Sequence, residues 1–108
     1  MMDNKIIKIA VDFSDTPGGR YIKDGDFSGE QFRNSLLDPL FSTLTKDEFL
    51  LVDLDGGFGY GISFLEEAFG GLARLHSPEE VKQKLRFKSD DEPELIPLIE
   101  EYIANANK

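Results

Sequence analysis

The sequence predicts a single α/β domain in which helices pack on a mixed, mainly parallel sheet to form two layers. The chain of 108 residues suits one compact domain. Hydrophobic residues make up 40% of it, and it contains nine Phe, which is enough to bury a core although the chain has no cysteine. After an initial pair of strands, predicted strands and helices alternate, as is typical of parallel strands joined by right-handed crossovers. The predicted element order is ββαβαβα.

The first two predicted strands form an antiparallel hairpin. Residues 6–13 alternate between apolar and polar, with Lys8 and Asp12 opposite the apolar positions, which predicts a half-exposed strand. Residues 17–19 supply turn chemistry, and the short run 20–23 predicts the second strand. The apolar side of the first strand comprises Ile7, Ile9, Val11 and Phe13.

Two capping-box patterns predict the starts of two helices. Ser28 with Gln31 begins the first, and Ser63 with Glu66 begins the second. Pro39 removes a backbone donor late in the first helix, which predicts a kink or an early end there.

Two glycines, Gly70 and Gly71, lie inside the second predicted helix, where together they cost about 2 kcal/mol relative to alanine. Close approach of this helix to the sheet, or of a partner to the helix, would offset that cost. Packing on the sheet is the favoured interpretation.

The remaining predicted elements are short. The nearly continuous apolar run 49–54 predicts a central strand covered on both faces. Residues 85–88 alternate like an edge strand, and the apolar spacing over 95–103 predicts a C-terminal helix. Residues 1–4 and 105–108 are expected to fray, and 1–108 form one domain.

The composition disfavours several classes of function. A net charge of -9 and a pI near 4.5 would repel nucleic acids and anionic membranes. The lack of cysteine, of a signal peptide and of a membrane-length apolar span favours the cytoplasm. Residues 24–29 match the first half of a calcium loop, but Ser35 replaces the bidentate Glu, so a turn is favoured. No metal and no cofactor are predicted.

The loop before the second helix is rich in glycine, with Gly57, Gly59 and Gly61. A loop between strand and helix can cradle a phosphate, although the Lys-Ser or Lys-Thr of a P-loop is missing and a flexible turn is favoured. The aromatic residues Phe58, Tyr60 and Phe64 either anchor a protein interface or fold back onto the core.

Ser63 has two interpretations that both remain open. As an N-cap it contributes about 1 kcal/mol to helix stability. A phosphate at Ser63 would be stabilised by the helix N-terminus but repelled by Glu66 and Glu67. His76 is the only histidine, and an intact helix would hold it about 20 Å from Ser63, which excludes a serine and histidine catalytic pair.

Two segments carry a resemblance to a known family. Residues 53–56 and the run Ser63 to Leu72 resemble the STAS-like domain family of unknown function (DUF4325), and residues 28–33 look like the start of its first helix. The related anti-sigma-factor antagonists carry a phosphorylated serine at the start of the corresponding helix, which implies Ser63 here. Those proteins have Asp-Ser-Ser-Gly where this chain has residues 61–64 as Gly-Ile-Ser-Phe.

The resemblance implies a non-enzymatic regulatory module that docks a partner through residues 56–62 and the helix starting at Ser63. A histidine-kinase-like ATPase is the implied partner, and the module is expected to be a monomer or a weak homodimer. One alternative is a small-ligand or nucleotide sensor at the glycine-rich loop. A less favoured alternative is a hydrolase that uses strand-end carboxylates. The carboxylates are Asp12, Asp53 and Asp55, and the expected partner-binding residues are Phe58, Tyr60, Phe64 and Glu67.

Overall fold

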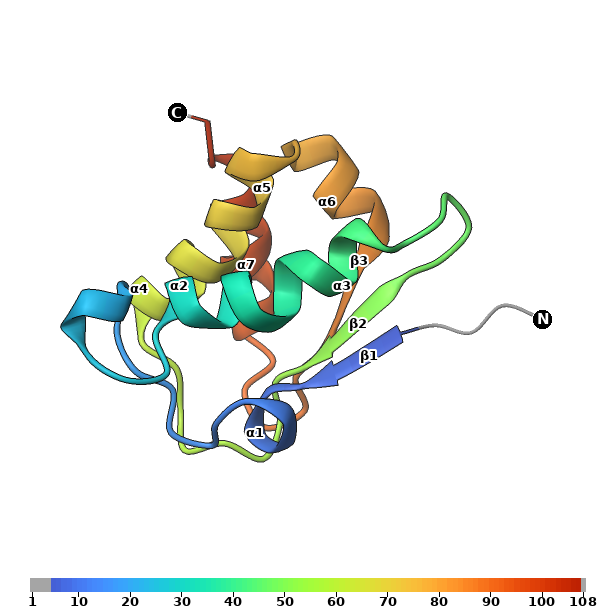
Figure 1. Ribbon diagram of the computed structural model, residues 1–108. Helices are drawn as coiled ribbons and strands as arrows, with labels where there is room; N and C mark the ends of the chain where they lie inside the picture. Colours follow the sequence, from blue (N-terminus) through green and yellow to red (C-terminus); the bar gives the residue numbers. More distant parts are fainter. Residues whose placement is uncertain (1–4, 108) are drawn as a thin grey trace.

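The computed structural model describes residues 5–107 and has a three-stranded parallel sheet with helices (Figure 1). The strands are β1 (Lys5–Lys8), β2 (Leu50–Asp53) and β3 (Leu85–Lys88). β2 is central and pairs in parallel with both neighbours. The predicted α/β class is confirmed, and so are the predicted strands 49–54 and 85–88 and the beginning of the predicted strand 6–13. The fraying predicted for residues 1–4 lies outside the described residues.

The predicted hairpin is wrong, and with it the predicted order ββαβαβα. The strand ends at Lys8, and the chain then turns into the short helix α1 (Ile9–Asp12). The Lys8 N–H donates to the Asp12 carboxylate at 2.8 Å. Residues 20–23 form no strand, because the Gly19 and Arg20 carbonyls accept N–H groups from the start of the next helix. Residues 22–24 form only a 3₁₀ turn, so the sheet within residues 5–107 is entirely parallel.

The first long helix runs without interruption through α2 (Gly29–Phe32), a π-helical stretch (Arg33–Leu37) and α3 (Asp38–Ser42). The predicted cap is confirmed, since the Ser28 hydroxyl accepts the Gln31 N–H at 3.0 Å. Pro39 does not end the helix early. It lies just after the π-helical stretch, in which the regular α-helical hydrogen-bond pattern is already interrupted.

The second long helix is built in the same way from α4 (Ile62–Leu65), a π-helical stretch (Glu66–Gly70) and α5 (Gly71–Leu75). Two further helices, α6 (Pro78–Lys84) and α7 (Leu95–Ala104), flank β3 in the chain. Figure 1 shows these helices gathered on one side of the strands.

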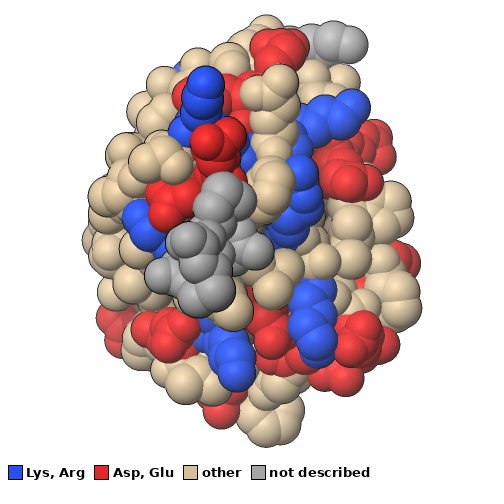
Figure 2. Space-filling model, turned by 90° about the vertical axis from the view of Figure 1, so that its right-hand side faces the viewer, with Lys and Arg blue, Asp and Glu red and all other residues tan. Residues whose placement is uncertain are grey.

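The core lies between the helices and one face of the sheet. That face presents Ile7, Val52 and Leu85, which are buried. On the opposite face Leu51 and Asp53 of β2 are only partly buried, and Ile6 and Arg86 on the neighbouring strands are exposed. The prediction that the central strand is covered on both faces is therefore wrong for this face. Figure 2 shows that the side of the molecule at the right of Figure 1 carries basic and acidic side chains intermixed. The buried helix residues that complete the core include Phe32, Leu37, Phe64, Phe69, Leu72 and Ile99.

Candidate functional site

The C-terminal ends of the parallel strands are the edge at which α/β sheets commonly build their sites. Here the loop of residues 54–61 leaves β2 and leads into α4. In Figure 1 this loop lies beside α1 at the lower edge of the view. A Cβ built on Gly56 would lie 3.6 Å from the Ala10 side chain, which confirms that α1 and the loop are neighbours.

The loop is held in place by hydrogen bonds to two other segments and by one bond within itself. Phe58 donates its N–H to the Asp15 carbonyl at 2.8 Å, and Gly56 donates its N–H to the Asp91 carboxylate at 3.1 Å. The Tyr60 hydroxyl donates to the Leu54 carbonyl at 2.9 Å. Gly56 and Gly59 have φ values of 89° and 124°, which L side chains rarely adopt. The glycines therefore shape an anchored loop rather than a freely flexible one.

The three aromatic side chains of this region have different environments. Phe58 is 83% exposed. Tyr60 is half-buried, and burial raises the pKa of its hydroxyl far above the usual range, with Asp53 adding to the effect. Phe64 is fully buried, and its ring centroid lies 5.8 Å from that of Phe32. The prediction that Phe64 binds a partner is wrong, because this residue belongs to the core.

Two further exposed apolar residues lie on the helices that adjoin this loop, α1 and α4, and the sequence does not predict them as part of the site. Ile62 is 66% exposed in the first turn of α4, and Val11 is 78% exposed on α1. The alternation predicts Val11 on the apolar side of a strand, but the strand ends at Lys8. One signal in the sequence could have identified Ile62. It is an apolar residue directly before the predicted cap at Ser63, outside the row of apolar residues that the helix buries.

The prediction that Ser63 is an N-cap is also wrong. The helix begins at Ile62, and Gly61, with extended backbone, occupies the capping position and accepts the Leu65 N–H at 3.2 Å. Ser63 is the second helical residue and is exposed. Glu66, the predicted partner in the capping box, turns away to arginine side chains.

Glu66 and Glu67 are held by an arginine network that joins three parts of the chain. Glu66 pairs with Arg74 at 2.8 Å and with Arg20 at 2.5 Å. The Arg74 hydrogen bond, outweighing partial burial and aided by Arg20, lowers the pKa of the Glu66 carboxyl. Glu67 is 9% exposed and pairs with Arg33 at 2.7 Å, so the prediction that it contacts a partner is wrong.

The network sits where the two long helices meet, between their π-helical stretches. Arg33 also donates to the Glu67 carbonyl at 2.6 Å. A Cβ added to Gly71 would collide with the Arg33 guanidinium, and one added to Gly29 would lie 2.5 Å from the Phe64 carbonyl oxygen. The glycines therefore admit the close approach of helix to helix, and the predicted approach of Gly71 to the sheet is wrong.

The carboxylates at the ends of the strands are occupied by structural hydrogen bonds. Asp53 accepts the Asp55 N–H at 2.9 Å. Asp55 in turn accepts the Asp91 N–H at 2.9 Å and pairs with the Lys88 ammonium at 2.7 Å. Asp12 accepts a backbone N–H at the end of β1. Within residues 5–107 no group of three or more acidic, histidine or cysteine side chains is placed to hold a metal ion.

His76 lies at the end of α5, away from these carboxylates. Its Nε2 is 2.7 Å from the Asp38 carboxylate, and its ring packs on Phe41 with centroids 4.8 Å apart. It therefore joins the ends of the two long helices.

The pairing of Asp55 predicts a specific loss of stability in acid. The Asp91 N–H and then the Lys88 ammonium lower the pKa of the Asp55 carboxyl from 3.8 to about 2. A carboxyl with a lowered folded-state pKa stabilises the fold above its unfolded-state pKa, and this contribution is lost as the pH falls from 3.8 towards 2. Urea denaturation of Asp55→Asn should therefore show a shallower fall in unfolding free energy across this window than the unchanged protein.

The matched control is Asp26→Asn, at an exposed aspartate whose carboxylate makes no hydrogen bond within residues 5–107. This variant should show the same steep fall in unfolding free energy with falling pH as the unchanged protein. Equal slopes for Asp55→Asn and the unchanged protein would contradict the pairing.

Comparison with known proteins gives one match. The model of a family described as a STAS-like domain of unknown function (DUF4325) matches residues 28–95, which include both long helices, β2 and β3. No curated protein and no solved structure matches the chain. None of the helices described here has the length and apolar character needed to cross a membrane.

Proposed function

Because the chain belongs to the STAS-like domain family (DUF4325), we propose that it is a cytoplasmic regulatory module that binds a partner protein and performs no chemistry on a substrate. Its docking surface consists of Val11, Phe58, Ile62 and Ser63. The observation that supports this most strongly is the 83% exposure of Phe58 on an anchored loop.

An anchored loop suits docking for a thermodynamic reason. Binding through a mobile loop costs conformational entropy, whereas a loop already held by hydrogen bonds loses little. Large apolar side chains at the centre of an interface supply most of the binding energy. Since the protein carries a net charge of -9, a partner with a positive surface around an apolar socket is favoured.

Ser63 adds a means of regulation to this surface. It is exposed beside Ile62, and the charges of Glu66 and Glu67 are offset by their arginine partners. A phosphate on Ser63 would therefore meet the positive end of a long helix with less repulsion from these two carboxylates. We propose that such a phosphate changes docking, with a histidine-kinase-like ATPase as the partner that adds it.

The contacts of the loop favour docking over nucleotide binding. Two of the backbone N–H groups of the loop, those of Gly56 and Phe58, are already bonded and therefore not open to a phosphate. Asp55 and Asp91 add negative charge beside them. Hydrolysis by strand-end carboxylates has equally little support, because Asp53 and Asp55 are engaged in hydrogen bonds that stabilise loops.

The proposal predicts that Phe58→Ser abolishes capture of the ATPase partner while leaving the fold unchanged. Burying a phenylalanine side chain contributes about 1.5–3 kcal/mol, or roughly 10- to 100-fold in affinity. Pull-down with purified ATPase measures the effect. Leu75→Ser is the matched control, because Leu75 is 59% exposed at the far end of the long helix that follows the loop. Equal capture by the two variants would count against the proposed docking surface.

A further inference from the structure

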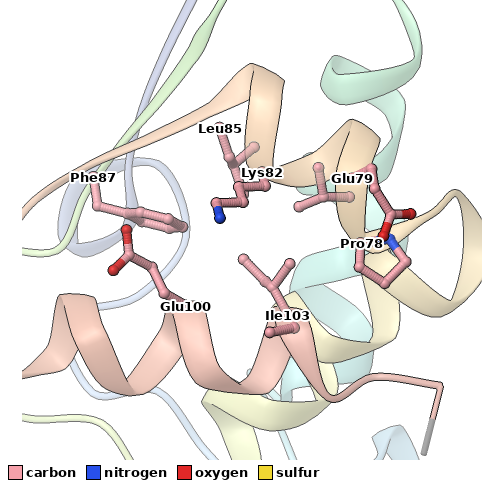
Figure 3. A pocket seen from close by; sticks show the side chains of 9 residues that line it. Pro78, Glu79, Lys82, Leu85, Phe87, Glu100 and Ile103 are labelled. Carbon is pink, nitrogen blue, oxygen red and sulfur yellow. The ribbon is translucent and has the colours of Figure 1, made fainter.

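A pocket of about 360 Å³ lies between α6, β3 and α7, away from the docking surface (Figure 3). Its walls are mainly apolar, and the side chains that define it are Val81, Leu85, Phe87 and Ile103. In Figure 3 the Ile103 side chain rises from α7 towards the space below α6. The volume is at the lower end of the range that binds small molecules or single large side chains.

The pocket lies along an edge of the sheet. Within residues 5–107, β3 pairs only with β2. The Leu54 N–H donates to the Lys88 carbonyl, so the backbone groups of Lys88 point towards β2. Because successive residues of a strand point their backbone groups to opposite edges, those of Leu85 and Phe87 point to the free edge of β3. The backbone groups of Leu85 already have partners: its N–H donates to the Val81 carbonyl, and its carbonyl accepts from the Arg86 guanidinium at 2.9 Å. Phe87 is therefore the position at which another extended chain can pair.

The rim of the pocket carries charge that the protein does not neutralise itself. Glu79, Lys82 and Glu100 line the pocket, and no ion pair in the described part of the chain includes any of them. Figure 3 shows the Glu100 carboxylate beside the Phe87 ring and Glu79 at the other end of the pocket, next to Pro78. Two carboxylates against one ammonium, in a protein of net charge -9, favour a basic ligand.

We propose that this pocket binds an extended peptide segment of a partner protein, which pairs with the backbone of Phe87 and inserts one apolar side chain. Lysine or arginine residues two positions before and after that side chain lie on the same side of the peptide and face Glu79 and Glu100. Pairing at a sheet edge combined with a side-chain pocket is a common mode of peptide recognition. This site is independent of the docking surface around Phe58.

The test is an NMR titration of the ¹⁵N-labelled protein with the capped peptide acetyl-Thr-Lys-Thr-Leu-Thr-Lys-Thr-amide. The amide signals of Phe87 and of the pocket residues should shift. Replacing the central leucine of the peptide by aspartate should weaken binding by roughly 10- to 100-fold, because an apolar side chain no longer enters the pocket. Glu100→Gln should weaken binding by about 2- to 5-fold, whereas the adjacent, exposed Glu101→Gln should not.

A second variant fills the pocket without removing a core side chain. Ala104 is exposed and lines the pocket, so Ala104→Phe should abolish peptide binding, while Asn105→Phe, next in the chain, should not. Phe58→Ser should bind the peptide normally, which separates this site from the proposed function.

Three results would overturn the proposal. The first is a peptide that shifts no pocket amide, and the second is a peptide that binds Ala104→Phe as tightly as the unchanged protein. The third is acetyl-leucine amide binding as tightly as the peptide, because the pocket would then recognise a small apolar molecule and not an extended chain.

Discussion

Arg33→Ala is expected to destabilise the protein by about 3–5 kcal/mol, the usual cost of removing one partner of a buried ion pair. The Glu67 side chain is 11% exposed, and without Arg33 its carboxylate would keep only the longer contacts to Arg20 and Arg74, at 3.4 and 3.9 Å. The Glu67 carbonyl would also lose its bond from the guanidinium. The two long helices would then meet around an undercompensated charge, and urea denaturation measures the cost.

The controls for Arg33→Ala separate the ion pair from a general effect of losing an arginine. Arg74 is more exposed and pairs with the partly exposed Glu66, so Arg74→Ala should cost only about 0–1 kcal/mol. The double variant Arg33→Met/Glu67→Met should recover much of the loss, because it leaves no charge behind. If Arg33→Ala costs no more than Arg74→Ala, the buried pair does not join the helices as described.

Phe64→Ala is expected to cost about 3–5 kcal/mol, as for other buried phenylalanines. The centroid of the Phe64 ring lies 5.8 Å from that of the Phe32 ring and 6.0 Å from that of the Tyr60 ring. Removing the Phe64 ring therefore opens a cavity between the two long helices and the anchored loop. Phe58→Ala is the matched control. Because Phe58 is largely exposed, its loss should change stability by less than about 0.5 kcal/mol.

Thermal and urea unfolding of the two phenylalanine variants give the comparison. Similar stabilities would mean that Phe64 is not a core residue. In that case the interpretation that Phe58, and not Phe64, belongs to the docking surface would fail too.

The parts of the fold that the sequence predicted correctly depend on local chemistry. The apolar run that became β2 (Leu50–Asp53) is bounded by polar residues, and the Ser28 cap needs only the N–H three residues later. The apolar spacing that became α7 (Leu95–Ala104) is set within one element. Each of these features depends on residues that are close in the sequence, so it can be predicted from the sequence alone.

Of the two errors in the first part of the chain, one has a local cause and the other a distant cause. Alternation over 6–13 fits a long strand, but the Asp12 carboxylate closes a helical turn on Lys8 instead. Residues 20–23 have strand-like side chains, yet Arg20 reaches Glu66, which lies 46 residues later in the sequence. No local pattern reports that pairing.

The candidate site was predicted as a segment and only partly as residues. The sequence correctly places a glycine-rich loop between the central strand and a helix, and it names Phe58 as a residue that either anchors an interface or folds back onto the core. Phe64 could not be told from Phe58, because an aromatic residue next to a glycine-rich loop can point either way. Ser63 fitted a cap by its spacing to Glu66, but the arginine network takes that carboxylate.

The proposed docking surface can be tested directly by hydrogen–deuterium exchange of this protein alone and mixed with a histidine-kinase-like ATPase, the proposed partner. Backbone N–H groups buried by a partner exchange more slowly. The account predicts added protection over residues 56–63 and α1 (Ile9–Asp12), with the C-terminal end of α5 (Gly71–Leu75) unchanged. Protection confined to α5 or to the open face of the sheet, with residues 56–63 exchanging as in the free protein, would contradict it.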